Sequence, residues 1–348
     1  MYYSVLKKFA VTAFILINFS CTSVIYKNII PSSNKKNYDS EFPYNDGSKQ
    51  LEEIGNSIYR VNSLAFYKAY VFDEDSKIKL KDLNDDVIKN RSIKTTYMDK
   101  SSSGTSTLIY SLNGTVALLT CAHVIDFPDT IVSYYSDKQG TFSDNVQSIA
   151  FMSRRFIYVA GFPEGSEVNE ILSDKSLDVT IIGNSYSSKF ERLFHVFNYP
   201  FGKAKELSWG NFVYVFGFPL NYKMISNAIV SNPNYDRSGS FFIDAVVNRG
   251  YSGGLVLAVK NGIPNFELVG IIEWVPEENE NILEPAPLEE SIKYNPLVPY
   301  KGDIFVKQQK LLRYGITKVI PMESIEDFLI KNKDFFIHNG YYFSIYKN

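Results

Sequence analysis

The sequence places its Val, Ile, Thr, Tyr and Phe residues in short runs separated by Gly, Asn, Asp and Ser. The first set favours strands and the second favours turns, so this chain is expected to be mainly β. The sharpest signal is Asn113-Gly114 between residues 107–112 and 115–121, because both turn positions tolerate positive φ in a two-residue hairpin. Asn261-Gly262 joins residues 254–260 to 266–274 in the same way. A first strand pair is expected over residues 58–72, and further strands at 178–183, 212–217, 228–231, 240–247 and 315–320.

The length and charge of the chain favour a globular protein that does not bind nucleic acid. At 348 residues the chain can bury a substantial core in one large domain or two small ones. Its 36 Lys and Arg residues nearly balance its 38 Asp and Glu residues, for a formal net charge of -2. Such a chain offers no basic field for a phosphate backbone, so nucleic acid is not an expected partner. The sequence holds no nucleotide-binding glycine loop or metal-ligand cluster, and we expect no cofactor and no metal.

Residues 1–21 have the organisation of an export signal. Lys7 and Lys8 precede an apolar run at residues 9–19, which is too short to span a bilayer but suits the centre of a secretory signal. The residues leading to Cys21 resemble the cleavage box of bacterial lipoproteins, although Asn18 stands where an aliphatic residue is usual. We expect a lipid anchor on Cys21 that holds the protein at the bacterial cell envelope, facing the periplasm or the exterior. Ordinary signal cleavage and an uncleaved anchor are the alternatives.

The rest of the chain is expected to form a tether, one folded domain and a tail. Residues 22–50 are rich in Ser, Asn, Lys, Pro and Asp and lack periodicity, which suits a flexible tether. The domain is expected over residues 51–335 and ends in an amphipathic helix that starts at Pro321. Two surface segments are expected within it: the polar residues 76–103, and an insertion at residues 275–303 where Glu and Pro dominate. Residues 336–348 are expected to be a polar C-terminal tail.

One serine lies among glycines, in the stretch Asn-Arg-Gly-Tyr-Ser-Gly-Gly at residues 248–254. Glycines let the backbone turn sharply and bring N–H groups close to a reacting atom, although inert turns use the same residues. A nucleophilic Ser252 would need a base, and histidine suits that task near neutral pH. His123 follows the apolar run 116–122, which would fix it at a strand end, whereas His195 and His338 have no such support. A purely structural His123 is the alternative.

A third group should orient the histidine. Asp178 begins the apolar run 178–182, so a strand would hold its carboxylate, although it could equally cap that strand. Asp174 is the competing carboxylate, but Ser176 and Leu177 separate it from the strand. Cys121, beside His123, is expected to be a buried and inert strand residue.

Three blocks then resemble the signatures of trypsin-like serine peptidases, particularly the bacterial Deg/HtrA type. They are Thr-Cys-Ala-His-Val at residues 120–124, Leu-Asp-Val at residues 177–179 and Gly-Tyr-Ser-Gly-Gly at residues 250–254, in the order His, Asp, Ser of that superfamily. Residues 103–105, 213–219 and 315–321 resemble flanking family segments in the same order. The resemblance covers about residues 55–330.

The resemblance implies an all-β fold of two packed six-stranded antiparallel β-barrels with a C-terminal α-helix. It also implies a catalytic triad of Ser252, His123 and Asp178, with an oxyanion hole made by the N–H groups of Gly250 and Ser252. Protein or peptide would be the substrate. Val246 and Ile316 would line the first specificity pocket, and their apolar character favours a small or aliphatic substrate residue there.

Two departures from the family pattern limit the resemblance. Tyr251 stands before the serine where digestive relatives carry an aspartate, so activation by a new N-terminus is not expected. Only seventeen residues follow Lys331, too few for the peptide-binding domain that often follows the protease in Deg/HtrA enzymes. The primary functional hypothesis is an exported serine endopeptidase. The alternative is a catalytically silent lipoprotein that binds or adheres through the same fold, since a fold does not guarantee its chemistry.

Overall fold

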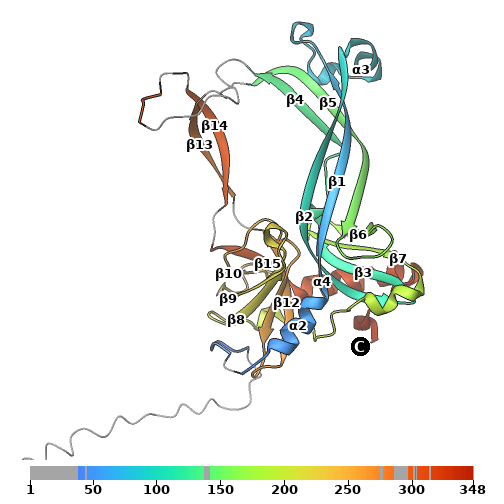
Figure 1. The fold of residues 1–348 in the computed structure, drawn as a ribbon, viewed down its shortest axis with the longest axis vertical. Coiled ribbons are helices and arrows are strands. Elements are labelled where there is room, and N and C mark those ends of the chain that lie inside the picture. The colour runs from blue at the N-terminus through green and yellow to red at the C-terminus, as the bar shows by residue number, and fades with distance from the viewer. Residues whose placement is uncertain are drawn as a thin grey trace, which may run out of the picture. The chain divides into compact units, whose positions relative to one another are not determined.

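The computed structural model of the chain describes residues 38–43, 45–136, 142–274, 277–285, 297–300, 302, 304–312 and 315–347 (Figure 1). The predicted signal peptide at residues 1–21, the predicted lipid site Cys21 and residues 22–37 of the predicted tether lie outside the described residues. None of the described helices combines the length and the hydropathy that crossing a bilayer requires. The predicted all-β fold of two six-stranded antiparallel barrels followed by a C-terminal helix is confirmed.

The first barrel is a sheet that closes on itself. Its strand order is β1-β2-β3-β7-β6-β5, and antiparallel pairing of β1 with β5 completes the ring, while β4 adds to the far side of β5. β3, which carries the predicted histidine block, is buried at six of its seven positions. The strands are β1 (Ile58–Val71), β2 (Lys94–Leu112), β3 (Thr115–Cys121), β4 (Thr130–Ser136), β5 (Phe142–Val159), β6 (Glu167–Asp174) and β7 (Val179–Ser185).

The second barrel is also closed, with the order β10-β15-β12-β11-β8-β9. Every residue of β11 is buried, as expected for a strand with core on both faces. Its strands are β8 (Phe212–Gly217), β9 (Met224–Asn232), β10 (Phe241–Ile243), β11 (Leu255–Val259), β12 (Phe266–Trp274) and β15 (Thr317–Pro321). The predicted strand over residues 240–247 is therefore much shorter than expected. Both predicted turns form, with positive φ at Asn113, Gly114, Asn261 and Gly262. The second lies in a longer loop, which is closed by the hydrogen bond from the Lys260 N–H to the Asn265 carbonyl.

The predictions for residues 58–103 were wrong in two places. Residues 58–72 form one long strand, β1, instead of a strand pair. The supposed surface connection at residues 76–103 contains the helix α3 (Asp85–Arg91) and the first ten residues of β2. The outer halves of β1, β2 and β5, together with β4, extend beyond the barrel, and we call residues 64–103, 130–136 and 142–156 the arm (Figure 1).

The end of the predicted tether belongs to the folded domain. Tyr38 is buried against the second barrel, and its hydroxyl donates a 2.6 Å hydrogen bond to Glu267. This carboxylate and burial together raise the pKa of Tyr38 far above its usual range, with burial the larger cause. A helix, α2 (Ser48–Asn56), then leads into β1. The folded domain therefore starts near Tyr38, earlier than the expected Leu51.

The predicted insertion at residues 275–303 is also more ordered than expected where it is described. β13 (Glu277–Pro285) and β14 (Ile304–Leu312) pair antiparallel along nine residues as a separate two-stranded sheet. Glu and Pro content misled the prediction, because a hairpin exposed to solvent needs no apolar alternation.

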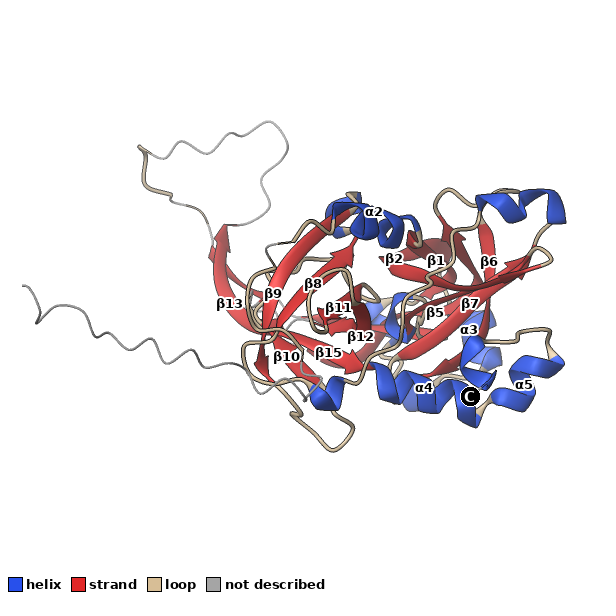
Figure 2. Ribbon diagram, turned by 90° about the horizontal axis from the view of Figure 1, so that it is seen from below, coloured by secondary structure: helices blue, strands red, loops and turns tan. Residues whose placement is uncertain are grey.

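The C-terminal residues form helices instead of a polar tail. The predicted amphipathic helix is α4 (Met322–Lys331), with Met322, Ile325, Phe328 and Leu329 buried. A second helix, α5 (Lys333–His338), follows. Phe336, Tyr341 and Phe343 pack into the main core cluster, the largest group of buried apolar side chains, which includes Leu118 of β3 and Leu257 of β11. Figure 2 shows α4 and α5 side by side along one side of the barrels. The rings of Tyr341 and Phe343 lie 5.8 and 5.7 Å from that of Tyr110 in β2, so this segment joins the first barrel.

Candidate active site

His123 lies where the end of β3 turns away from the first barrel. A short 3-10 turn over Ala122–Val124 follows the strand, and its two outer residues are buried while the His123 side chain is 46% exposed. The buried strand therefore holds the backbone of His123, while the imidazole stays accessible to solvent.

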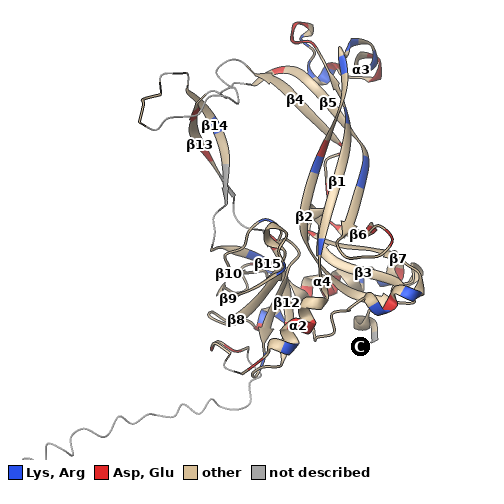
Figure 3. Ribbon diagram, in the orientation of Figure 1, with Lys and Arg blue, Asp and Glu red and all other residues tan. Residues whose placement is uncertain are grey.

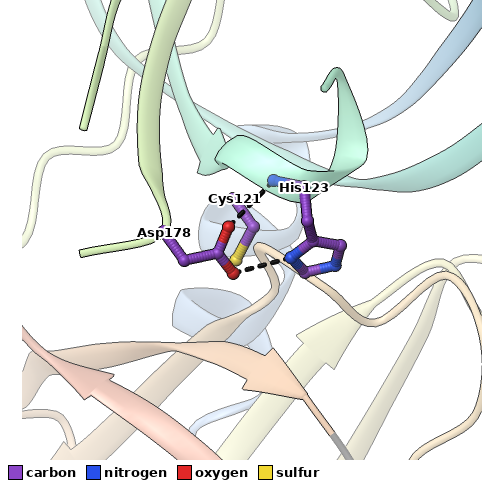
Figure 4. A group of neighbouring side chains, drawn as sticks. All are labelled: Cys121, His123 and Asp178. Atoms are coloured by element: carbon purple, nitrogen blue, oxygen red, sulfur yellow. Dashed lines mark hydrogen bonds and ion pairs between the residues drawn. The ribbon is translucent and has the colours of Figure 1, made fainter. Parts of the chain in front are cut away.

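Asp178 holds His123 with both carboxylate oxygens, one at the imidazole and one at the backbone (Figure 4). Oδ2 lies 2.6 Å from Nδ1 of His123, and Oδ1 accepts a 2.8 Å hydrogen bond from the His123 backbone N–H. Asp178 has φ +58, a left-handed conformation that aspartate tolerates better than most residues, immediately before β7. The pair fixes Nδ1 as the proton-bearing nitrogen and leaves Nε2 to act as a base.

The competing carboxylate has a different task. Oδ1 of Asp174 accepts hydrogen bonds from the N–H groups of Ser176 and Leu177 and from the Ser176 hydroxyl. These hydrogen bonds lower the pKa of Asp174, the one from the Ser176 hydroxyl most. Asp174 therefore stabilises the turn before Asp178 and does not contact His123.

Ser252 lies in the turn that leads into β11, and this turn is tied to both barrels. Its own carbonyl accepts a 2.8 Å hydrogen bond from the N–H of Thr105 in β2, and the next N–H, that of Gly253, donates to the Ile272 carbonyl in β12 at 2.8 Å. Gly250 has φ +102, and a Cβ there would collide with the Phe218 carbonyl. The glycine is therefore required both for its conformation and for the close approach of two backbones.

Thr105 positions the serine turn, and the sequence did not reveal this role. Its hydroxyl donates to the Gly250 carbonyl at 2.7 Å and accepts from the Phe218 N–H at 3.0 Å, and the group is fully buried. The N–H groups of Gly250 and Ser252, predicted to form the oxyanion hole, have no hydrogen-bond partner among the described residues. The only sequence signal for Thr105 was its membership of the block at residues 103–105.

Tyr251 is buried inside the second barrel and does not cover the serine. Its side chain lies against Gly217, where any Cβ would clash with the ring, and its hydroxyl lies 3.3 Å from that of Ser226. Tyr251 thus fixes the turn before Ser252 from the side of the core.

Cys121 lies beneath the pair as a fully buried residue. Its Sγ donates to the Ile272 carbonyl at 3.1 Å. Burial, reinforced by the negative charges of Asp178 and Glu273, raises the pKa of the Cys121 thiol well above its usual range, so it is no competing nucleophile. Cys121, His123 and Asp178 come close enough together to suggest a metal site. Both oxygens of Asp178 and the thiol are already engaged in the hydrogen bonds above, so we assign no metal to this group.

The remaining predicted residues are less constrained. The Ser252 hydroxyl makes no hydrogen bond to His123 in this structure. Val246, after β10, is 72% exposed and Ile316, directly before β15, is 49% exposed, so the specificity pocket stays a prediction. His195 and His338 are both exposed, and His338 is the last residue of α5. Among the described residues neither makes a hydrogen bond or ion pair with Asp178 or Ser252.

Comparison with known families agrees with this fold. The family model described as "Trypsin-like peptidase domain" matches residues 104–271, a range that contains His123, Asp178, Gly250 and Ser252. A search of curated proteins found no significant match to the sequence. The chain therefore contains a trypsin-like peptidase domain with the double β-barrel of chymotrypsin-like proteins.

Proposed function

We propose that the protein is a serine endopeptidase that cleaves polypeptides through Ser252, His123 and Asp178. The observation that carries this proposal is that Asp178 bonds His123 twice, at Nδ1 of the imidazole at 2.6 Å and at the backbone N–H at 2.8 Å. A structural histidine does not need its tautomer fixed while its other nitrogen stays exposed, whereas a general base does. The trypsin-like domain makes protein or peptide the substrate class.

The proposed reaction has the two stages of acyl transfer. Ser252 Oγ attacks the carbonyl carbon of the scissile peptide bond while Nε2 of His123 takes the hydroxyl proton. The N–H groups of Gly250 and Ser252 then stabilise the oxyanion, and His123 delivers its proton to the leaving amine, which departs as the C–N bond breaks. Water, activated by the same imidazole, hydrolyses the acyl-enzyme and restores Ser252.

Labelling by a fluorescent fluorophosphonate tests the proposal directly, since the reagent needs an activated serine. We expect the purified wild type to be labelled and Ser252→Ala and His123→Ala not to be. Casein cleavage should follow the same pattern and decline at acid pH, because a protonated imidazole cannot accept the Ser252 proton. A folded wild type without labelling would contradict the endopeptidase.

The alternative is a silent binding or adhesion protein on this scaffold. One observation favours it: the Ser252 hydroxyl is not hydrogen-bonded to His123 in this structure. Catalytic hydrogen bonds are often long before substrate binds, so this carries less weight than the His123–Asp178 geometry. Polypeptide binding that is identical in wild type and Ser252→Ala, without turnover, would establish the alternative.

We further propose that the enzyme belongs to the Deg/HtrA type, and that it is exported and anchored at the cell envelope through lipid on Cys21. The Deg/HtrA type is supported by the sequence blocks at residues 120–124, 177–179 and 250–254. Export and the anchor are supported by Lys7 and Lys8, the apolar residues 9–19 and the following cysteine. Cys21→Ala should move the protein from the membrane fraction to the soluble fraction. If the variant remains in the membrane fraction, the proposed lipid anchor on Cys21 is refuted.

A further inference from the structure

β2 has an open edge that begins beside the candidate active site. β1 pairs with β2 from Lys94 to Thr107 without a register shift, but β3 pairs with β2 only from Thr107 onward. No described residue forms a ladder with the other side of β2 between Lys94 and Gly104. This part of β2 lies in the arm, next to β1 (Figure 1).

The hydrogen-bond alternation identifies which backbone groups are free. The Leu108 N–H donates to the Ser57 carbonyl, so even-numbered residues of β2 point their backbone groups toward β1 and odd-numbered residues point theirs away. Thr105 confirms this, because its N–H donates to Ser252 and its carbonyl accepts from the Thr120 hydroxyl. The outward N–H and carbonyl groups between the arm tip and the site belong to Thr95, Tyr97, Asp99, Ser101 and Ser103.

The side chains beside this edge suit an extended polypeptide. Asp99 lies opposite Phe66 in the ladder, so odd-numbered side chains of β2 share the face of Phe66. On that face Phe66, Phe151 and Tyr97 are 39%, 37% and 75% exposed. Acidic and basic residues are interspersed on the arm, as Figure 3 shows, and β2 itself carries Lys94, Asp99 and Lys100. The surface therefore favours a strand with apolar side chains at alternate positions over a strongly acidic or strongly basic strand.

We propose that the arm part of this edge, from Ser101 to Thr95, binds the substrate beyond the second residue after the cleaved bond as an added β-strand. The proposal rests on the endopeptidase function and deepens it. His123 must reach the leaving amine, and His123 belongs to the first barrel, so the leaving part of the substrate lies on the side of β2. From Ser103 to Thr95 the edge spans about 27 Å, enough for about nine substrate residues. Main-chain pairing of this kind gives affinity with little sequence preference.

Peptide length tests the proposal. Two peptides share one cleavage sequence, and one ends two residues after the cleaved bond while the other continues for eight more residues with alternate apolar side chains. We expect kcat/KM to be at least ~10-fold higher for the long peptide, because several backbone hydrogen bonds are added. Two further long peptides carry N-methyl groups at either the odd or the even positions of the extension. The peptide whose methyl groups replace the N–H groups that face β2 should lose the increase in kcat/KM, and the other should keep it. Equal kcat/KM values, or equal effects of the two methylation patterns, would overturn the proposal.

Ser101→Pro tests the edge from the side of the protein. Proline removes the outward N–H of residue 101 without removing a ladder bond to β1. The ratio of kcat/KM for the long peptide over the short peptide should fall toward one, whereas Ser101→Ala keeps the N–H and should keep the ratio. A ratio unaffected by Ser101→Pro contradicts the inference. So does a wild-type dimer that Ser101→Pro dissociates, since a second copy would then occupy the edge.

A binding measurement separates this proposal from the proposed function. Fluorescence anisotropy of the labelled extension with Ser252→Ala needs no catalysis, and Ser252→Ala carrying Ser101→Pro should bind at least ~10-fold more weakly. If the wild type neither labels nor cleaves while this binding difference holds, the peptidase proposal fails and the edge stands. If the wild type is labelled and cleaves, but Ser101→Pro does not weaken binding of the extension, only the edge proposal fails.

Discussion

At the scale of single residues, Asp178 is the best-defined part of the candidate site. Its two oxygens bond two different nitrogens of His123, which no capping aspartate would do. Asp174, four residues earlier, bonds only its own turn. The geometry thus distinguishes two carboxylates that the sequence could rank only by their distance from a strand.

The distinction predicts unequal effects of the same substitution. Asp178→Asn should lower kcat by a factor on the order of 10³ to 10⁴, because an amide favours the wrong imidazole tautomer. Asp174→Asn keeps a carbonyl acceptor for the turn and should leave fluorophosphonate labelling close to wild type. Rates of labelling and of peptide hydrolysis measure both variants. Equal losses in the two would refute the assignment of Asp178.

At the scale of elements, β2 supports the serine turn through one hydroxyl. Thr105 bonds the Gly250 carbonyl and the Phe218 N–H, and valine has the same shape without the hydroxyl. Two residues along the strand, the hydroxyl of Thr107 is equally buried but has no hydrogen-bond partner among the described residues. β2 therefore contains two buried threonines, one whose hydroxyl is hydrogen-bonded and one whose hydroxyl is not.

Thr105→Val should destabilise the protein by about 1–3 kcal/mol and slow the proposed catalysis, because it leaves two backbone groups unpaired next to the predicted oxyanion hole. Thr107→Val removes no hydrogen bond and should be neutral or slightly stabilising. Urea denaturation and kcat for a short peptide measure the two effects. A destabilised Thr107→Val with a neutral Thr105→Val would contradict the role of Thr105.

What the sequence could predict at this scale depended on burial. The hairpin at Asn113-Gly114 and the strands β3, β7, β8, β11 and β12 were predictable because their runs are apolar and their turns need positive φ. The outer half of β2 was missed because an edge strand exposed on both faces shows no apolar alternation. The candidate triad followed from family-like blocks, whereas Thr105 depends on contacts across about 145 residues of sequence, which no local pattern reveals.

At the scale of the whole domain, the segment after the second barrel returns to the first. The Tyr110 hydroxyl in β2 donates to the Gly340 carbonyl at 3.0 Å, and Phe336 is fully buried in the main core cluster. α4, in contrast, packs against β12 and β15 of the second barrel. Residues 322–343 thus connect the cores of the two barrels.

Phe336→Ala should therefore lower the free energy of unfolding by about 3–5 kcal/mol, through lost burial and the cavity left behind. Phe335→Ala is the matched control, because that ring is 42% exposed and its removal should cost far less. Urea denaturation followed by tryptophan fluorescence gives both values. Similar losses for the two rings would show that α5 does not seal the core.

This return of the chain also sets an order of assembly. Residues 336–343 are translated after both barrels, yet they complete a core whose first strand begins at Ile58. The first barrel consequently cannot reach its final packing while its own residues leave the ribosome, and the native contacts must wait for nearly three hundred further residues. Such a delay keeps the domain incompletely folded during synthesis, as the proposed export through a translocation pore would require.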